Sequence, residues 1–112
     1  MTEKEITIKV ASGENGQPKK ISWEATDSPT GKEEECSSFI LSLWDGKAKD
    51  QLNIHLWTPK MSVEEMNHFY FRNMMLMADS YERATQNKLE AQKLRDHAVG
   101  FGKRTKVLKD EA

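Results

Sequence analysis

The residues of this 112-residue chain that could carry chemistry are three histidines, one cysteine and a run of glutamates. His55, His68 and His97 lack the HxH or HxxxH spacing that places two imidazoles on one side of a strand or helix. Cys36 has no second cysteine with which to form a disulfide or a Cys-x-x-Cys site. The run Glu33–Glu35 lacks the oxygen spacing of a calcium loop and is expected to lie in a solvated loop. We expect the histidines and the cysteine to be structural residues.

Glycine-rich phosphate loops and a nucleophile elbow are also missing from the sequence. Because neither a nucleophile–base pair nor a set of metal ligands is visible, we expect a protein that is not an enzyme and uses no cofactor or metal. The 17 basic and 18 acidic residues give a net charge of −1, which predicts no general attraction to nucleic acid. The single cysteine, the charged N-terminus and the lack of a long apolar run predict a cytoplasmic protein that is not inserted in a membrane.

The first part of the chain has the pattern of a β-hairpin. Apolar residues alternate with polar ones from Ile6 to Val10 and again from Ile21 to Ala25, which is typical of half-buried strands. A cluster of glycine, asparagine and proline lies between the two segments and favours a turn. We therefore predict a first hairpin over residues 3–26.

A second hairpin is predicted over residues 36–58, with Asp45-Gly46 beginning its turn. Both of its faces are rich in apolar residues. Strand alternation places one group on a single face: Phe39, Leu41, Leu43, Leu52, Ile54 and Leu56. The opposite face then carries Ile40, Trp44 and Trp57.

Residues 62–101 are predicted to be helical. Ser62 and Glu65 form a capping box at the start. A break near residues 85–87, followed by a weaker second cap of Asn87 with Glu90, leaves open whether there are one or two helices. Gly100 and Gly102 are expected to end the helical region, before a charged tail over residues 103–112. Apolar side chains from residue 69 to residue 77 cover more than one helical face. Either a second helix covers the excess, or part of it is a binding or dimer surface.

The order of these elements predicts an α+β fold in one domain spanning residues 1–112. We expect the two consecutive hairpins to form one four-stranded antiparallel sheet. One or two C-terminal helices would pack on one face of that sheet. If the leucine-rich face of the second hairpin is turned toward the helices, Ile40, Trp44 and Trp57 point outward and form an interaction hot spot. A β-bulge that shifts the alternation would instead bury one tryptophan.

Four segments carry a resemblance to a known family: Ile21–Asp27, Leu41–Asp45, Leu52–Thr58 and Met61–Met66. Over roughly residues 3–80 the chain resembles the gliding-motility protein GldC family of Bacteroidetes. The resemblance implies a small accessory protein of the gliding machinery, which is linked to cell-envelope protein secretion. It implies no enzymatic activity, no cofactor and no catalytic residues.

The sequence and the resemblance together predict a non-enzymatic scaffold that binds a protein of the gliding or envelope-secretion machinery. Two alternatives stay open. One is a small-ligand carrier with an apolar pocket between the sheet and the methionine-rich helix. The other is a structural homodimer that has no external partner.

Overall fold

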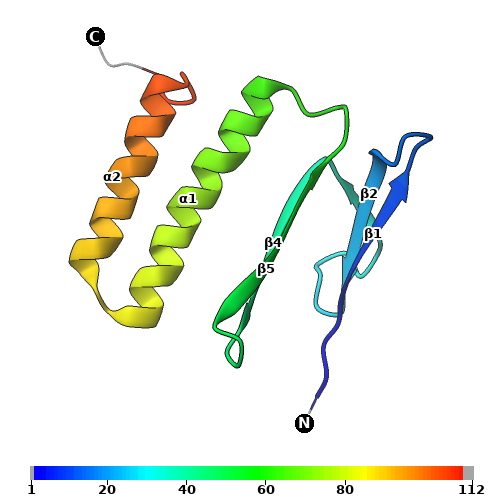
Figure 1. The fold of residues 1–112 in the computed structure, drawn as a ribbon, viewed down its shortest axis with the longest axis horizontal. Helices are drawn as coiled ribbons and strands as arrows, with labels where there is room; N and C mark the ends of the chain where they lie inside the picture. Colours follow the sequence, from blue (N-terminus) through cyan, green and yellow to red (C-terminus); the bar gives the residue numbers. More distant parts are fainter. Residues whose placement is uncertain (1, 110–112) are drawn as a thin grey trace. The chain divides into compact units, whose positions relative to one another are not determined.

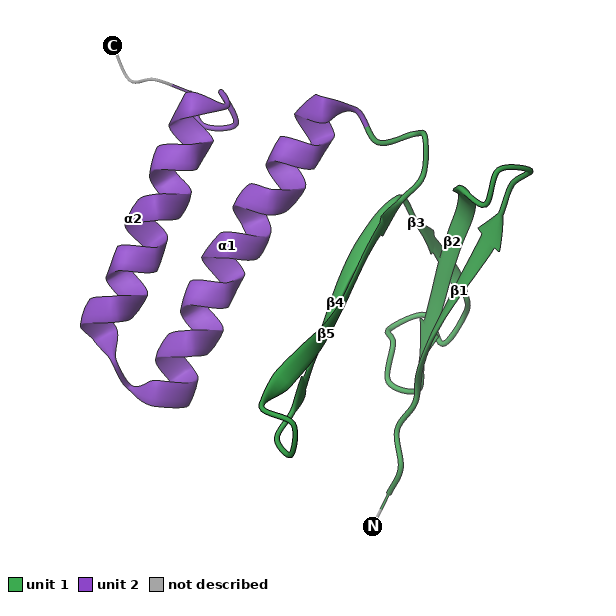
Figure 2. Cartoon of the chain, in the orientation of Figure 1, with its two compact units in different colours: residues 1–61 green, residues 62–112 purple. Residues whose placement is uncertain are grey.

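The computed structural model describes residues 2–109, and the chain divides into two compact units (Figure 2). Residues 1–61 form a β unit and residues 62–112 form a helical unit. The elements in chain order are β1 (Ile6–Ser12), β2 (Pro18–Ala25), β3 (Glu34–Cys36), β4 (Ser38–Asp45), β5 (Asp50–Trp57), α1 (Val63–Thr85) and α2 (Lys88–Arg104) (Figure 1). The predicted α+β class is confirmed.

The predicted single four-stranded sheet is wrong, because the strands form two separate antiparallel sheets. One sheet has the order β1-β2-β3, and the other contains β4 and β5. Glu34 and Glu35, which we expected in a loop, and Cys36, which we expected to begin the second hairpin, form β3 and pair with β2. Since β3 occupies the edge of β2 that β4 would have needed, β4 pairs with β5 alone among the described strands.

The apolar face of the first sheet is buried at one end and open at the other. Ile21 lies between Val10 on β1 and Cys36 on β3, and its side chain is 1% exposed. Ile6, on the same face near the other end of β1, is 77% exposed. Strand β2 also contacts β5 of the second sheet. The core of the β unit therefore lies around Ile21.

On the opposite face of the first sheet, a hydrogen bond from Ser22 holds the side chain of Glu33 in place. The hydroxyl of Ser22, which is buried, donates to Glu33 Oε1 at 2.6 Å, and Lys9 Nζ lies 3.7 Å from Glu33 Oε2. The hydrogen bond and, next, the charge of Lys9 hold the pKa of Glu33 below its ordinary value of 4.5. The contact fixes the segment that leads into β3.

This contact predicts an acid-dependent loss of stability in the β unit. Because the pKa of Glu33 is lowered by folding, its stabilising effect is complete above the unfolded-state pKa and is lost as the pH falls through the folded-state pKa. We expect Glu33→Gln to remove this part of the acid dependence, measured as the urea midpoint of tryptophan fluorescence across a pH series. Ser22→Ala, which removes the donor of the hydrogen bond, should also reduce the acid dependence of the urea midpoint. Unchanged pH profiles in both variants would contradict the assignment.

The helical region forms two helices, and their ends are set by the predicted caps. The side chain of Ser62 accepts a hydrogen bond from the amide of Glu65 at 3.0 Å, which begins α1. Gln86 ends α1 in the left-handed conformation with φ of 60°. Asn87 then accepts from the amide of Glu90 at 3.1 Å and begins α2. The polar residues 85–87 therefore divide the helical region into two helices, which form a hairpin.

Small residues allow α1 and α2 to pack closely. Ala78 of α1 and Ala91 and Ala98 of α2 have 0% exposure. Beside this contact, Arg95 donates to Asp79 at 2.9 Å and forms an ion pair with Glu82, also at 2.9 Å. These hydrogen bonds and charges raise the pKa of Arg95 above its ordinary value.

The expectation that glycines end the helical region is wrong, because α2 continues through Gly100 and Gly102 to Arg104. Gly102 is buried, and a Cβ atom there would lie 2.9 Å from the ring of Phe71. The glycine therefore permits a close helix contact and is not a terminator. Beyond α2, the amide of Leu108 donates to the carbonyl of Gly102 at 3.0 Å, so this part of the expected charged tail folds back. Residues 110–112 lie outside the described part.

Helix α2 covers only one side of α1. Several large apolar side chains of the two helices stay exposed, namely Val63, Tyr70, Leu76, Met77, Leu89 and Leu94. Helix α2 therefore does not cover all of the apolar side chains of α1. The sequence-based alternative in which a second helix covers the whole excess is not what the structure has. Within residues 2–109, neither helix combines the length and the apolar character needed to cross a bilayer.

Candidate protein-interaction site

The β4–β5 hairpin presents an exposed face that carries both candidate tryptophans. Its register is continuous from Ser38 opposite Trp57 to Asp45 opposite Asp50, so no bulge shifts the alternation. We call one side of this hairpin the tryptophan face: Ser38, Ile40, Ser42 and Trp44 of β4 with Gln51, Asn53, His55 and Trp57 of β5. Trp44 is 65% exposed and Trp57 is 52% exposed. The predicted sharing of one face by Ile40, Trp44 and Trp57 agrees with this register.

The two tryptophans lie at opposite ends of this face. Trp57 is opposite Ser38, whereas Trp44 is opposite Gln51 near the turn. The cross-strand pairs that contain them are six residues of β4 apart, which corresponds to about 20 Å. Ile40 lies one pair of the same face away from Trp57, beside His55. In one chain, Ile40 and Trp57 therefore form a cluster, and Trp44 is separate from it.

Polar side chains occupy the middle of the tryptophan face. The Ser42 hydroxyl donates to Asn53 Oδ1 at 2.7 Å, and Gln51 Nε2 donates to the same oxygen at 3.0 Å. This network satisfies the polar groups locally and fixes the Asn53 side chain. The face thus offers two apolar areas separated by a polar strip.

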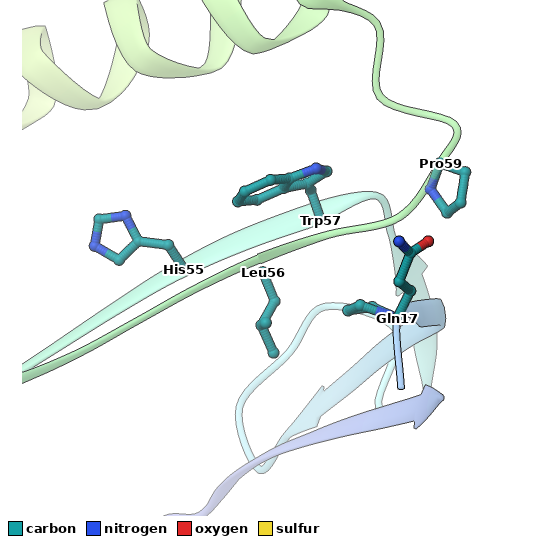
Figure 3. Close-up of a pocket in the computed structure, with 6 residues that line it drawn as sticks. Gln17, His55, Leu56, Trp57 and Pro59 are labelled. Atoms are coloured by element: carbon teal, nitrogen blue, oxygen red, sulfur yellow. The ribbon is translucent and has the colours of Figure 1, made fainter. Parts of the chain in front are cut away.

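A cleft of about 300 Å³ adjoins Trp57 at the end of β5. It is lined by Gln17, Pro18, His55, Leu56, Trp57 and Pro59. Figure 3 shows the side chains of His55 and Trp57 on one side of β5 and that of Leu56 on the other, which is the side of the first sheet. Since the lining includes both faces of β5 and the start of β2, the cleft runs along the outer edge of β5.

Sequence reasoning did not identify this cleft. Nothing in the sequence places the start of β2 beside the end of β5. The contact between β2 and β5 depends on how the two sheets meet. This cleft is not the ligand pocket that the sequence-based alternative expected between the sheet and the methionine-rich helix.

The candidate chemical residues lie on different elements. His55 lies on the tryptophan face, whereas His68 is in α1 and His97 in α2. Burial raises the pKa of the Cys36 thiol, which disfavours the reactive thiolate. In the described part of the chain, no group of three His, Cys, Asp or Glu side chains is placed to hold a metal ion.

Comparison with curated proteins and with solved structures gives no match. The family model described as "Gliding motility-associated protein GldC-like" matches residues 18–107. This match covers most of the chain, and it includes β2, both strands of the tryptophan face and both helices. The chain therefore belongs to the GldC-like family of gliding motility-associated proteins.

Proposed function

We propose that this protein is a non-enzymatic scaffold that binds another protein of the gliding or envelope-secretion machinery through the tryptophan face. The observation that carries the proposal is the exposure of two tryptophans on one side of a single hairpin, at 65% and 52%. Tryptophan is enriched among residues that dominate binding energy, because it offers a large apolar area with an indole N–H at its edge.

The geometry favours a macromolecular partner over a small ligand. The rows holding Trp44 and Trp57 lie about 20 Å apart, a span that a protein surface can contact and a small molecule cannot. The polar strip of Ser42, Gln51 and Asn53 between them would match polar groups on a partner. The cleft beside Trp57 supports the alternative of a small-ligand carrier, but about 300 Å³ is at the small end for ligand pockets.

The proposal is tested by replacing the exposed tryptophans. We expect Trp44→Ser with Trp57→Ser to leave the thermal midpoint nearly unchanged, because both side chains are more than half exposed. The tagged double variant should lose gliding or envelope-secretion proteins that the wild type recovers from its native cells after brief crosslinking. Mass spectrometry of the recovered proteins measures this loss.

The matched control is Ile6→Ser, which removes an exposed apolar side chain of the same β unit that lies outside the tryptophan face. It should recover the same proteins as the wild type. The proposal would be overturned by equal recovery with the double variant, or by a large fall in its thermal midpoint, which would show that the tryptophans are structural.

A further inference from the structure

The outer edge of β4 is an unpaired strand edge. Among residues 2–109, β4 pairs with β5 and with no other strand, so the second sheet has two strands only. A two-stranded sheet is marginally stable unless further strands or other elements complete it. An open edge with free N–H and C=O groups is also a template for pairing with another strand.

The first sheet carries protection at its edges, whereas β4 does not. Edge strand β1 contains Lys9 and has a register irregularity at Ala11–Ser12, and edge strand β3 is 3 residues long with two glutamates. Short length, charge and irregular register are the common means of blocking edge pairing. From Ser38 to Trp44, β4 has no charged residue, no proline and a continuous register.

Strand β5 is a poorer candidate for pairing than β4. Gln17 and Pro18 lie across the cleft from the end of β5, and β2 contacts β5. Pro59 follows β5 directly after Thr58. The first sheet therefore flanks the outer edge of β5.

One hydrogen bond identifies which backbone groups of β4 point outward. The amide of Thr58 donates to the carbonyl of Ser37 at 2.9 Å, which makes these two residues a hydrogen-bonded pair next to the end of the ladder. Hydrogen-bonded and non-hydrogen-bonded pairs alternate in an antiparallel ladder. The N–H and C=O groups directed away from β5 are those of Ser38, Ile40, Ser42 and Trp44.

We propose that this edge is a dimer interface, in which β4 of one copy pairs antiparallel with β4 of a second copy about a two-fold axis at Leu41. The two hairpins then form a continuous four-stranded sheet with the order β5-β4-β4-β5. A two-fold contact between identical strands uses the same surface of both copies. The register must be centred on a residue, because a half-residue centre would place the leucine-rich face of one copy beside the tryptophan face of the other.

The centre at Leu41 gives the longest pairing without placing a charge against an apolar residue. Leu41 lies opposite itself, and Leu43 lies opposite Phe39 of the second copy, so apolar residues meet on the leucine-rich face. A centre at Ser42 would instead place Phe39 opposite Asp45. With the centre at Leu41, the outward amide of Ile40 donates to the outward carbonyl of Ser42 in the second copy. The outward amide of that Ser42 donates in turn to the carbonyl of Ile40.

The same register joins the two separated parts of the tryptophan face. Trp44 of one copy lies opposite Ser38 of the other, and Ser38 is the cross-strand partner of Trp57 within its own chain. Trp44 and the other copy's Trp57 therefore flank a serine, about 10 Å apart at the backbone. The use of this joined cluster for partner binding rests on the proposed function, whereas the dimer itself does not.

Disulfide trapping tests the interface and its register. In a Cys36→Ser background, Leu41→Cys would place two cysteines opposite each other in a non-hydrogen-bonded pair, with Cα atoms about 4.5 Å apart. A disulfide needs Cα atoms closer than about 7 Å. In the matched control Leu43→Cys, the Cα atoms of the two cysteines would be about 14 Å apart. We expect mild oxidation to give at least about tenfold more linked dimer with Leu41→Cys than with Leu43→Cys on a non-reducing gel.

A second variant tests the edge without changing an apolar side chain. Ser42→Pro removes an amide that points away from β5, so the hairpin keeps its own ladder while pairing between copies is blocked. Sedimentation velocity should show a dimer for the wild type and a monomer for Ser42→Pro. Asn53→Pro removes an outward amide at the same row of β5 and should remain dimeric.

Three results would overturn the proposal: a monomeric wild type at micromolar concentration, equal linking with Leu43→Cys, or preferential linking through Ile54→Cys on β5. If Ser42→Pro fails to fold, the comparison of Leu41→Cys with Leu43→Cys still tests the interface. A dimer that persists while the tryptophan double variant recovers every partner would refute the proposed function and leave the interface standing.

Discussion

Replacement of Ile21 by alanine is expected to lower the free energy of unfolding of the β unit by about 2–5 kcal/mol. Ile21 is the one large side chain in the described part of the chain that is fully buried, and it lies between Val10 and Cys36. Alanine would remove buried methyl groups and leave a cavity that the sheet can fill only in part. Since small domains are stable by about 5–15 kcal/mol in total, the loss would be large.

Tryptophan fluorescence measures this effect in the β unit alone, because the three tryptophans are Trp23, Trp44 and Trp57. The urea midpoint of Ile21→Ala should fall clearly below that of the wild type. Ile6→Ala is the matched control: the same residue type on the same face of the same sheet, but 77% exposed. It should change the free energy of unfolding by no more than about 0.5 kcal/mol. Similar midpoints for both variants would contradict the assignment of the core to Ile21.

The second large effect is expected at Gly102, where alanine should destabilise the helical unit. In most helix interiors, alanine in place of glycine stabilises by about 1 kcal/mol. At Gly102 the added Cβ would lie 2.9 Å from two ring carbons of Phe71 and 3.0 Å from Leu108. Overpacking of this kind costs about 1–3 kcal/mol, so the net change should be a loss. Gly102→Leu should increase that loss.

Gly100 provides the opposite expectation two residues away. A Cβ at Gly100 would meet the guanidinium of Arg104 at 3.0 Å, and this flexible side chain can move aside. Gly100→Ala should therefore raise the thermal midpoint of the helical unit, followed by circular dichroism at 222 nm, while Gly102→Ala should lower it. If both alanine variants raise the midpoint, the close contact between α2 and Phe71 is absent.

The residues of the tryptophan face connect the proposed partner binding with the proposed dimer interface. Within one chain, Trp44 is separated from Ile40 and Trp57 by the polar strip. Pairing of β4 between two copies would bring Trp44 close to the other Trp57 and produce two identical clusters. A scaffold built in this way would present two equivalent binding surfaces to a partner.

The sequence by itself determined the strands of both hairpins and the starts of both helices. Strand alternation identified the leucine-rich face and the tryptophan face of the second hairpin, and the structure has the same register. The caps at Ser62 and Asn87 were readable because a short polar side chain can satisfy the free amides of the next helical turn. These features depend on neighbours within a few residues, and residue types carry that information directly. The four quoted segments were also sufficient to identify the family.

Only the tertiary structure decided how these elements meet. A three-residue strand, Glu34–Cys36, occupies the edge of β2 and divides the expected sheet in two. Its glutamates resemble a loop in sequence, because the pairing energy comes from a partner strand distant in the chain. Gly102 resembled a helix end, yet it serves a contact with Phe71 that no local pattern reveals. The separation of Trp44 from Trp57 likewise follows from the antiparallel register, since alternation fixes the face of a residue and only the strand partner fixes its position along that face.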